Sequence, residues 1–187
     1  MISEPNDSTV VAAALVSAEA FGIEQILASP NLVPRQKGLY SWWMAPGSIP
    51  GLSGQAHPTR PDLQLLYVGI ASKPTSGLRK RLTTHIGGTS RRSTQRLSLA
   101  AVLADQNGWN ATMVSGRPAL APEFEAQLSS FMAKHLTVSW LVHGQPESVE
   151  TAVIQRLMPP LNLDGNSGHP SYSYVKAKRA AFRSAVR

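Results

Sequence analysis

A segment from Leu65 to His85 carries the residue types that could hold and attack a phosphate group. It begins as an apolar run that contains Tyr67, passes through a turn rich in proline and glycine, and becomes basic before it ends. This pattern predicts a strand over 64–70 followed by a short helix over 76–86. In a strand beside a helix that carries arginines, the arginines could bind a phosphate. The strand tyrosine could then activate the nucleophile that attacks this phosphate.

The predicted helix over 76–86 carries Arg79, Lys80 and Arg81 in succession. An arginine offers a fixed fork of N–H donors to a phosphate, and we expect Arg81 to do so. A solvated basic helix would give the same run of charges. His85 follows Arg81 by four positions and therefore lies on the same helical face. A proton-relay role and a structural role both remain open for this histidine.

A candidate metal ligand lies much later in the chain. Pro146 suits the first turn of a helix that we expect to continue to residue 158, and Glu150 falls near the start of that helix. A carboxylate is a hard oxygen ligand that suits one Mg²⁺ or Mn²⁺ ion. Acids are also common near helix N-termini because they interact favourably with the helix dipole. Glu147, one turn earlier, is the rival carboxylate.

A second tyrosine is predicted to lie beside the first. Residues 38–44, which contain Tyr40, are rich in β-forming side chains and predict a strand. The segment over 45–62 holds four prolines and three glycines, so we expect a long loop there. The two flanking strands then form an antiparallel pair, and residues 136–142 predict a third strand. Loops of such length are often functional, and this one is a candidate for substrate selection.

The remaining periodic segments predict helices. We expect them from residue 7 or 8 to 27, over 90–104, over 122–135 and from 172 to the C-terminus. The division that follows is an N-terminal helical arm over 1–34, a catalytic domain over 35–170 and a basic helix over 171–187 that packs on the domain.

The composition favours an anionic partner. The net charge is +7 and the isoelectric point is about 10.1, so we expect a nucleic acid, DNA rather than RNA, and no membrane. The absence of cysteine excludes disulfides, thiolate zinc sites and a cysteine nucleophile. The first residues lack a secretory signal, so we expect a cytoplasmic protein. The side chains expected to contact nucleic acid are Arg79, Lys80, Arg91, Arg92, Arg96, Lys176, Arg179 and Arg183.

The order and spacing of these motifs resemble the GIY-YIG nuclease family. Glu150 precedes Asn162 by twelve positions, and Pro159 precedes Asn162 by three. The separation of the two tyrosines is longer than in minimal members. The residues that carry the resemblance are Gly38-Leu39-Tyr40, Tyr67-Val68-Gly69, Arg81 with His85, Glu150, and Pro159 with Asn162.

The resemblance implies an α+β fold, with a small three-stranded and mainly antiparallel sheet flanked by helices. To this the chain adds an N-terminal and a C-terminal helix. It also implies an endonuclease that hydrolyses phosphodiester bonds with one Mg²⁺ or Mn²⁺ ion held by Glu150. The implied catalytic residues are Tyr40, Tyr67, Arg81, His85, Glu150 and Asn162.

Several roles stay open at this point. Either tyrosine could deprotonate the attacking water, with Tyr40 favoured and Tyr67 orienting the phosphate. Asn162 is expected to hold its loop or to bond near the metal. The alternative function is a catalytically silent nucleic-acid-binding domain on the same fold, and a third is a basic interaction protein in which the motifs coincide by chance. The oligomeric state is open.

Overall fold

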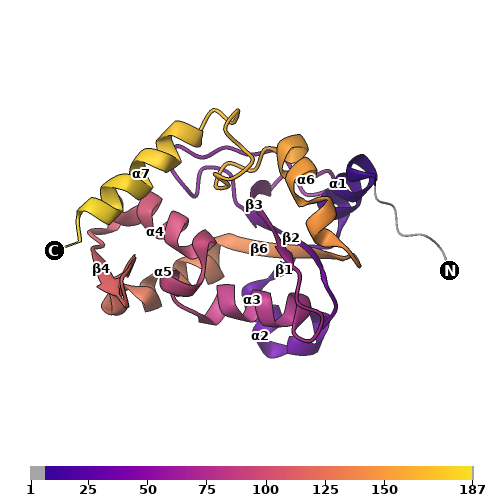
Figure 1. Cartoon of the computed structure of the whole chain (residues 1–187), viewed down its shortest axis with the longest axis horizontal. Helices are drawn as coiled ribbons and strands as arrows, with labels where there is room; N and C mark the ends of the chain where they lie inside the picture. Colours follow the sequence, from indigo (N-terminus) through magenta and orange to yellow (C-terminus); the bar gives the residue numbers. More distant parts are fainter. Residues whose placement is uncertain (1–6, 187) are drawn as a thin grey trace.

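The computed structural model describes residues 7–186, and four of its strands form one antiparallel sheet in the order β1-β6-β2-β3 (Figure 1). The strands predicted over 38–44, 64–70 and 136–142 are all present. The fourth has only two residues and was not predicted. The strands of this sheet are β1 (Phe21–Gly22), β2 (Gly38–Met44), β3 (Gln64–Ala71) and β6 (Leu136–Val142).

Helices flank the sheet, which confirms the predicted α+β class. A separate hairpin of β4 (Ala111–Val114) and β5 (Arg117–Leu120) occupies part of the segment between 104 and 122. The α-helices are α1 (Ser8–Ser17), α2 (Ile23–Ala28), α3 (Gly77–Gly87), α4 (Thr94–Asn107), α5 (Pro122–His135), α6 (Glu150–Leu157) and α7 (Tyr172–Ser184). Short 3-10 helices are η1 (Pro30–Leu32), η2 (Ser90–Arg92) and η3 (Pro146–Ser148).

The prediction of one N-terminal helix reaching residue 27 was wrong. The helix ends at Ser17, and the chain then extends to form β1 before α2 begins. Phe21 pairs with Val138 of β6 and its ring stacks on Trp140 at 4.9 Å between centroids. Pairing with a distant strand therefore outweighs the local helical pattern. The first six residues of the predicted arm lie outside the described part of the chain, as does Arg187 at the end of the predicted C-terminal helix.

Two other predicted helices begin differently from the expectation. The stretch over 90–104 is interrupted at Ser93, which separates η2 from α4. Its hydroxyl accepts a hydrogen bond from the backbone N–H of Arg96 and so caps α4. The helix expected from Pro146 is likewise divided into η3 and α6, so that Glu150 is the first residue of α6.

The sheet is buried on both faces, as the complete burial of β2 shows. Side chains alternate along this strand. Leu39 and Trp43 pack in a cluster with residues of α1 and α6, whereas Tyr40 and Trp42 belong to the larger cluster with residues of α3, α4 and α5. In Figure 1, α1 and α6 lie together on one side of the sheet, and α3 lies on the other side. The two tyrosine-bearing strands thus face the layer that contains α3.

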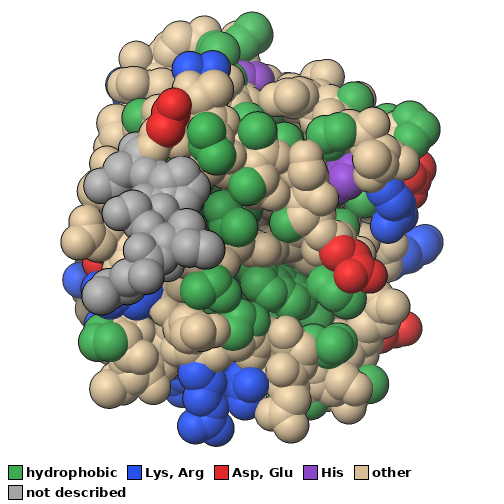
Figure 2. All heavy atoms as spheres, turned by 90° about the vertical axis from the view of Figure 1, so that its right-hand side faces the viewer, with side chains coloured by type: hydrophobic (Ala, Val, Ile, Leu, Met, Phe, Trp, Pro, Cys, Tyr) green, Lys and Arg blue, Asp and Glu red, His purple; other side chains and the backbone are tan. Residues whose placement is uncertain are grey.

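The surface differs from one side to another. On the side of α1 and α6, hydrophobic side chains gather near the middle of the face and Lys and Arg side chains lie toward its edges (Figure 2). The basic residues expected to contact nucleic acid belong to other elements, namely α3, η2, α4 and α7. Among the helices of residues 7–186, none has both the length and the apolar character needed to cross a membrane.

Candidate active site

Strand register brings the two tyrosines to one face of the sheet. Tyr40 lies opposite Gly69, and the adjacent pair on that face is Trp42 with Tyr67. The tyrosine ring centroids are 6.4 Å apart. A Cβ atom at Gly69 would collide with the Tyr40 ring and hydroxyl oxygen. The glycine of the Tyr-Val-Gly motif is therefore what allows the Tyr40 ring to lie against β3.

Helix α3 supplies two partners for the Tyr40 hydroxyl. His85 Nε2 lies 2.8 Å from the Tyr40 oxygen, and Arg81 Nε donates a hydrogen bond to the same oxygen at 3.2 Å. Leu78 and Leu82 are completely buried, which fixes the face of α3 that turns toward the sheet. Residues four positions apart on that helix thus converge on one tyrosine oxygen. This contact joins three of the residues that the sequence singled out.

His85 is buried and linked to a residue whose role the sequence did not indicate. Its Nδ1 atom lies 2.6 Å from the Ser93 hydroxyl, which is itself buried. Burial, with the positive charges of Arg81 and Arg96 nearby, lowers the pKa of His85 to about 3. The imidazole is therefore neutral at physiological pH. Ser93 follows two of the arginines expected to contact nucleic acid, but its own hydroxyl contacts the imidazole.

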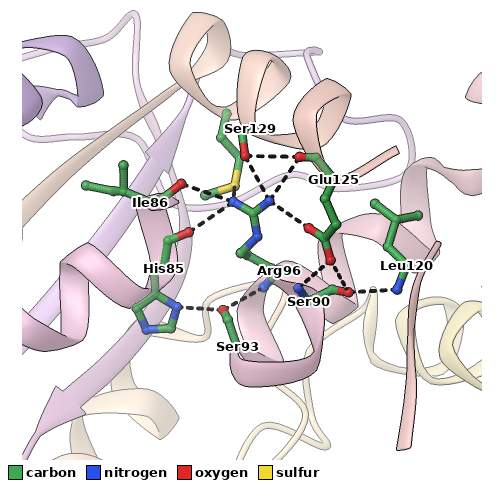
Figure 3. Close-up of polar contacts among 9 residues, drawn as sticks. His85, Ile86, Ser90, Ser93, Arg96, Leu120, Glu125 and Ser129 are labelled. Carbon is green, nitrogen blue, oxygen red and sulfur yellow. Dashed lines mark hydrogen bonds and ion pairs between the residues drawn. The ribbon is translucent and has the colours of Figure 1, made fainter. Parts of the chain in front are cut away.

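Arg96 was predicted to contact nucleic acid, and the structure contradicts this prediction. Its side chain has 0% exposure and forms an ion pair with Glu125 at 2.8 Å (Figure 3). Further bonds reach the carbonyl oxygens of His85 and Ile86 and the hydroxyl of Ser129. A guanidinium held by this set of acceptors is not available to a phosphate. Its role is to tie the end of α3 to α5 through a buried polar cluster.

The same cluster extends to the loop before α4. Glu125 Oε1 accepts hydrogen bonds of 2.6 Å from both the backbone N–H and the hydroxyl of Ser90 (Figure 3). The Ser90 hydroxyl oxygen in turn accepts from the backbone N–H of Leu120 on β5. A single buried carboxylate therefore positions η2 and β5 as well as Arg96.

Glu150 is half-buried at the start of α6. Burial raises the pKa of its carboxyl group above the usual value, the charge of Arg81 opposes this, and Glu147 and Asp164 add to the increase. Within residues 7–186 the Glu150 carboxylate takes part in no ion pair. Glu147 is exposed and faces Lys37 at 3.8 Å. Of the two candidate carboxylates, Glu150 is the one that shares its surroundings with Arg81 and the tyrosines.

The donor set around Glu150 fits a hydrated divalent ion. No group of three or more His, Cys, Asp or Glu side chains in the described part of the chain could enclose a metal. One half-buried carboxylate, which forms no ion pair within residues 7–186, leaves most of a metal shell to water and substrate oxygens. Mg²⁺ characteristically retains several waters and uses one or two carboxylates. The residues present therefore fit Mg²⁺ or Mn²⁺ better than an ion that needs a closed protein cage.

Asn162 connects the loop after α6 to the strand that carries Tyr67. Its side-chain oxygen accepts from the backbone N–H of Val68 at 3.0 Å, and its amide nitrogen donates to the Val68 carbonyl at 2.9 Å. The Asn162 side chain is buried, and the side-chain amide of Asn166 donates a hydrogen bond to the backbone carbonyl oxygen of Asn162. Both hydrogen-bonding ends of the amide are thus used by backbone between Tyr67 and Gly69, and this fixes β3 next to the site.

The tyrosines and Arg81 influence one another. Burial raises the pKa of Tyr40, and the adjacent Arg81 opposes the increase by charge and by its hydrogen bond. The pKa of Tyr67 is also raised, mainly by burial. Burial lowers the pKa of the Arg81 guanidinium, but the neighbouring Tyr40, Tyr67 and Glu150 outweigh this, and the net change is upward. Because the net change in its pKa is upward, the Arg81 guanidinium is positively charged.

The other basic residues of α3 occupy two different positions. Arg79 donates to the carbonyl oxygen of Val33 at 2.7 Å and to Asn31, so its guanidinium fastens α3 to the segment before β2. Lys80 is exposed and lines a cleft of about 580 Å³ together with Lys73 and Arg81. Arg81 is therefore one of the residues that the cleft leaves open to solvent.

The remaining predicted basic residues divide between η2 and α7. Arg91, Arg92 and Arg183 line a second cleft, in which Arg117 of β5 also takes part. Arg117 was not singled out from the sequence, because an isolated arginine in a weak strand carries no local signal. Lys176 is exposed and lies over the Tyr172 ring.

Arg179 lies closer to the site than its position on a surface helix suggests. Its side chain is half-buried, and burial and Arg183 lower the pKa of the guanidinium, while Asp164 and Tyr67 act in the opposite direction. The Arg179 Nε atom is buried without a hydrogen-bond partner in the described part of the chain. Helix α7 thus places one arginine within electrostatic reach of Tyr67.

A comparison with protein-family models agrees with this geometry. The model described as the GIY-YIG catalytic domain matches residues 38–181. The match begins at the first residue of β2 and extends into α7, so it includes both tyrosines, Arg81 and Glu150. Searches of curated proteins and of solved structures found no match. Because the matched region covers well over half of the 187 residues, the chain belongs to the GIY-YIG family, and its catalytic domain is a nuclease domain.

Proposed function

We propose that the protein is a metal-dependent endonuclease that hydrolyses nucleic-acid phosphodiester bonds, with DNA as the expected substrate. The observation that carries the proposal is the convergence of Arg81 and His85 on the Tyr40 oxygen. Glu150 lies within electrostatic reach of the same arginine and both tyrosines. A base, a phosphate ligand and a metal ligand are the three groups that such a hydrolysis needs.

The proton positions around His85 follow from counting donors. The Ser93 oxygen accepts the Arg96 backbone N–H at 3.1 Å, so the Ser93 hydroxyl still has its own proton to donate. The other partner of that hydroxyl in residues 7–186 is His85 Nδ1. A buried donor without an acceptor costs about 1–3 kcal/mol, so the hydroxyl donates to Nδ1. The neutral imidazole then carries its proton on Nε2 and donates to Tyr40.

With this arrangement the Tyr40 oxygen receives two N–H donors, one from Arg81 and one from His85. Two such donors oppose the burial that raises the pKa of Tyr40, and the proposal depends on them to form the phenolate that accepts a proton from the attacking water. Tyr40 is shielded from solvent, whereas Tyr67 and Arg81 are partly exposed. The water therefore has to reach the Tyr40 oxygen between those two neighbours. Tyr67, whose pKa is raised well above its usual range, stays neutral and donates to a phosphate oxygen.

Arg81 and Glu150 act on the phosphate. The Arg81 Nε atom is engaged with Tyr40, and its terminal N–H groups remain for a non-bridging phosphate oxygen. Glu150 would hold the Mg²⁺ or Mn²⁺ ion, which when bound stabilises negative charge on the phosphate and the leaving oxygen. Asn162 positions this arrangement by fixing β3 and needs no chemical role of its own.

The alternative is a catalytically silent nucleic-acid-binding domain on the same fold. A cleavage assay distinguishes the nuclease from the silent binding domain. The protein is incubated with supercoiled plasmid and Mg²⁺ or Mn²⁺, and with duplex RNA as a parallel substrate. The proposal expects nicking of the plasmid by the wild type and loss of nicking in Arg81→Ala. Wild-type protein that binds these nucleic acids but cuts neither would establish the silent domain. Cleavage of RNA alone would keep the hydrolase and replace the substrate.

A further inference from the structure

A second cationic site lies apart from Arg81. A cleft of about 480 Å³ is lined by four arginines from three separate elements, and no acidic residue among residues 7–186 contributes to its lining. They are Arg91 and Arg92 of η2, Arg117 of β5 and Arg183 of α7. None of the four takes part in an ion pair within the described part of the chain. Four unpaired positive charges around one hollow repel one another unless an anion fills it.

Hydrogen bonds fix the elements that line this cleft. Arg91 Nε donates to the Val114 carbonyl at 3.0 Å, which fixes the direction of that side chain. Glu125 and Ser90 hold η2 against β5 through the buried bonds shown in Figure 3. Because Glu125 is engaged with Arg96 and Ser90, its carboxylate is not free to neutralise the cleft. Among residues 7–186, therefore, no carboxylate that lines the cleft neutralises the four arginines.

Two connections join the cleft to the active site. Ser93 directly follows Arg92 and contacts His85, which reaches the Tyr40 oxygen. On α7, Arg183 is one turn after Arg179, the arginine within electrostatic reach of Tyr67. Four residues of helix advance about 6 Å. One strand of B-DNA carries a phosphate about every 3.4 Å of its axis, so Arg179 and Arg183 are separated by about two phosphate spacings along α7.

We propose that this cleft is a second phosphate-binding site, which holds the nucleic-acid backbone a few nucleotides from the bond that is cut. The site recognises phosphodiester charge and not base sequence. This inference rests on the proposed nuclease function. It adds that substrate affinity depends on four arginines that do not touch the reacting phosphate.

Binding of a labelled DNA duplex in the absence of divalent ions tests the proposal. Fluorescence anisotropy gives the dissociation constant at a series of salt concentrations. The variants are Arg117→Gln and Arg183→Gln, both at exposed positions, and Arg156→Gln, an exposed arginine of α6, is the matched control. We expect each cleft variant to weaken binding and to reduce the log–log salt slope by about 0.9, and the control to leave the slope unchanged.

Steady-state cleavage supplies the second measurement. The cleft variants should raise KM and leave kcat unchanged, because the reacting groups are intact. A salt slope equal to that of the control, or a fall in kcat without a change in affinity, would overturn the second site. If inorganic phosphate displaced the labelled duplex as effectively as unlabelled duplex at the same concentration of phosphate groups, the cleft would be a site for a free anion. That result would also overturn the proposed second site. Wild-type protein that neither binds nor cuts DNA or RNA would instead refute the nuclease function itself.

Discussion

Replacement of Glu125 by alanine should be among the most destabilising single changes in the molecule. Arg96 is wholly inaccessible and Glu125 has 14% side-chain exposure, so the substitution leaves a guanidinium buried without its counter-ion. Removing one member of such a pair typically costs about 3–5 kcal/mol. For a chain of this length each kcal/mol lowers Tm by about 2–4 °C, which gives an expected decrease of about 6–20 °C.

Thermal and urea unfolding followed by circular dichroism measure this loss. Glu123→Ala is the matched control, since Glu123 lies in the same first turn of α5 but is exposed. The control should lose no more than the helix-dipole contribution of about 0.3–1 kcal/mol. The double substitution Arg96→Met with Glu125→Leu should be more stable than Glu125→Ala alone, because it removes the stranded charge. A Glu125→Ala protein as stable as the control would refute the assignment of Arg96 to the core.

Three further predictions concern the residues around Tyr40. Ser93→Gly keeps most of the capping preference but lacks the hydroxyl. It should shift the His85 tautomer seen by ¹⁵N NMR and slow cleavage, with Ser93→Thr restoring both; an Nδ1–H tautomer in the wild type would refute the proton assignment. Gly69→Ala should displace the Tyr40 ring, cost about 1–3 kcal/mol and abolish nicking; an unchanged Tm together with unchanged nicking would contradict this. His85 has its pKa lowered from 6.5 to about 3 in the folded protein. As the pH falls, His85 therefore takes up a proton in the unfolded chain before it does so in the folded protein. Stability should therefore fall by about 1.4 kcal/mol per pH unit as the pH decreases below 6.5, and His85→Gln should lack this contribution in urea titrations at pH 6 and 5; equal slopes in the two proteins would count against it.

The sequence predicted the elements whose information is local. Residues 38–44 are rich in β-formers, and they form β2 with the predicted bounds. The antiparallel pairing with β3 across the long loop was likewise predicted, and it explains why the two tyrosines lie close together. These features depend on strand propensity, on turn-forming residues and on the alternation of side chains along a strand. All three can be read directly from the sequence.

The features that could not be predicted depend on partners far away in sequence. Arg96 stands in a run of basic and polar residues that looks solvated, and only the approach of Glu125 from α5 makes its burial possible. Strand β1 exists because β6 offers it an edge. Ser93 has the sequence signal of a helix cap, but nothing local reveals that its hydroxyl meets His85. Such contacts follow from the fold and not from any pattern in the chain.

The proposed metal-dependent cleavage depends most directly on Glu150. Single-turnover cleavage of a labelled DNA duplex, measured over a series of Mg²⁺ concentrations, compares the wild type with Glu150→Gln and with Glu147→Gln. The glutamines keep the size of each side chain and remove its charge, and Glu147 serves as the control because it is exposed and faces Lys37. We predict that Glu150→Gln loses at least about 100-fold in rate, a factor equivalent to about 2.7 kcal/mol, and that Glu147→Gln retains the wild-type rate and Mg²⁺ dependence. Equal rates for the wild type and Glu150→Gln would contradict the proposed active site.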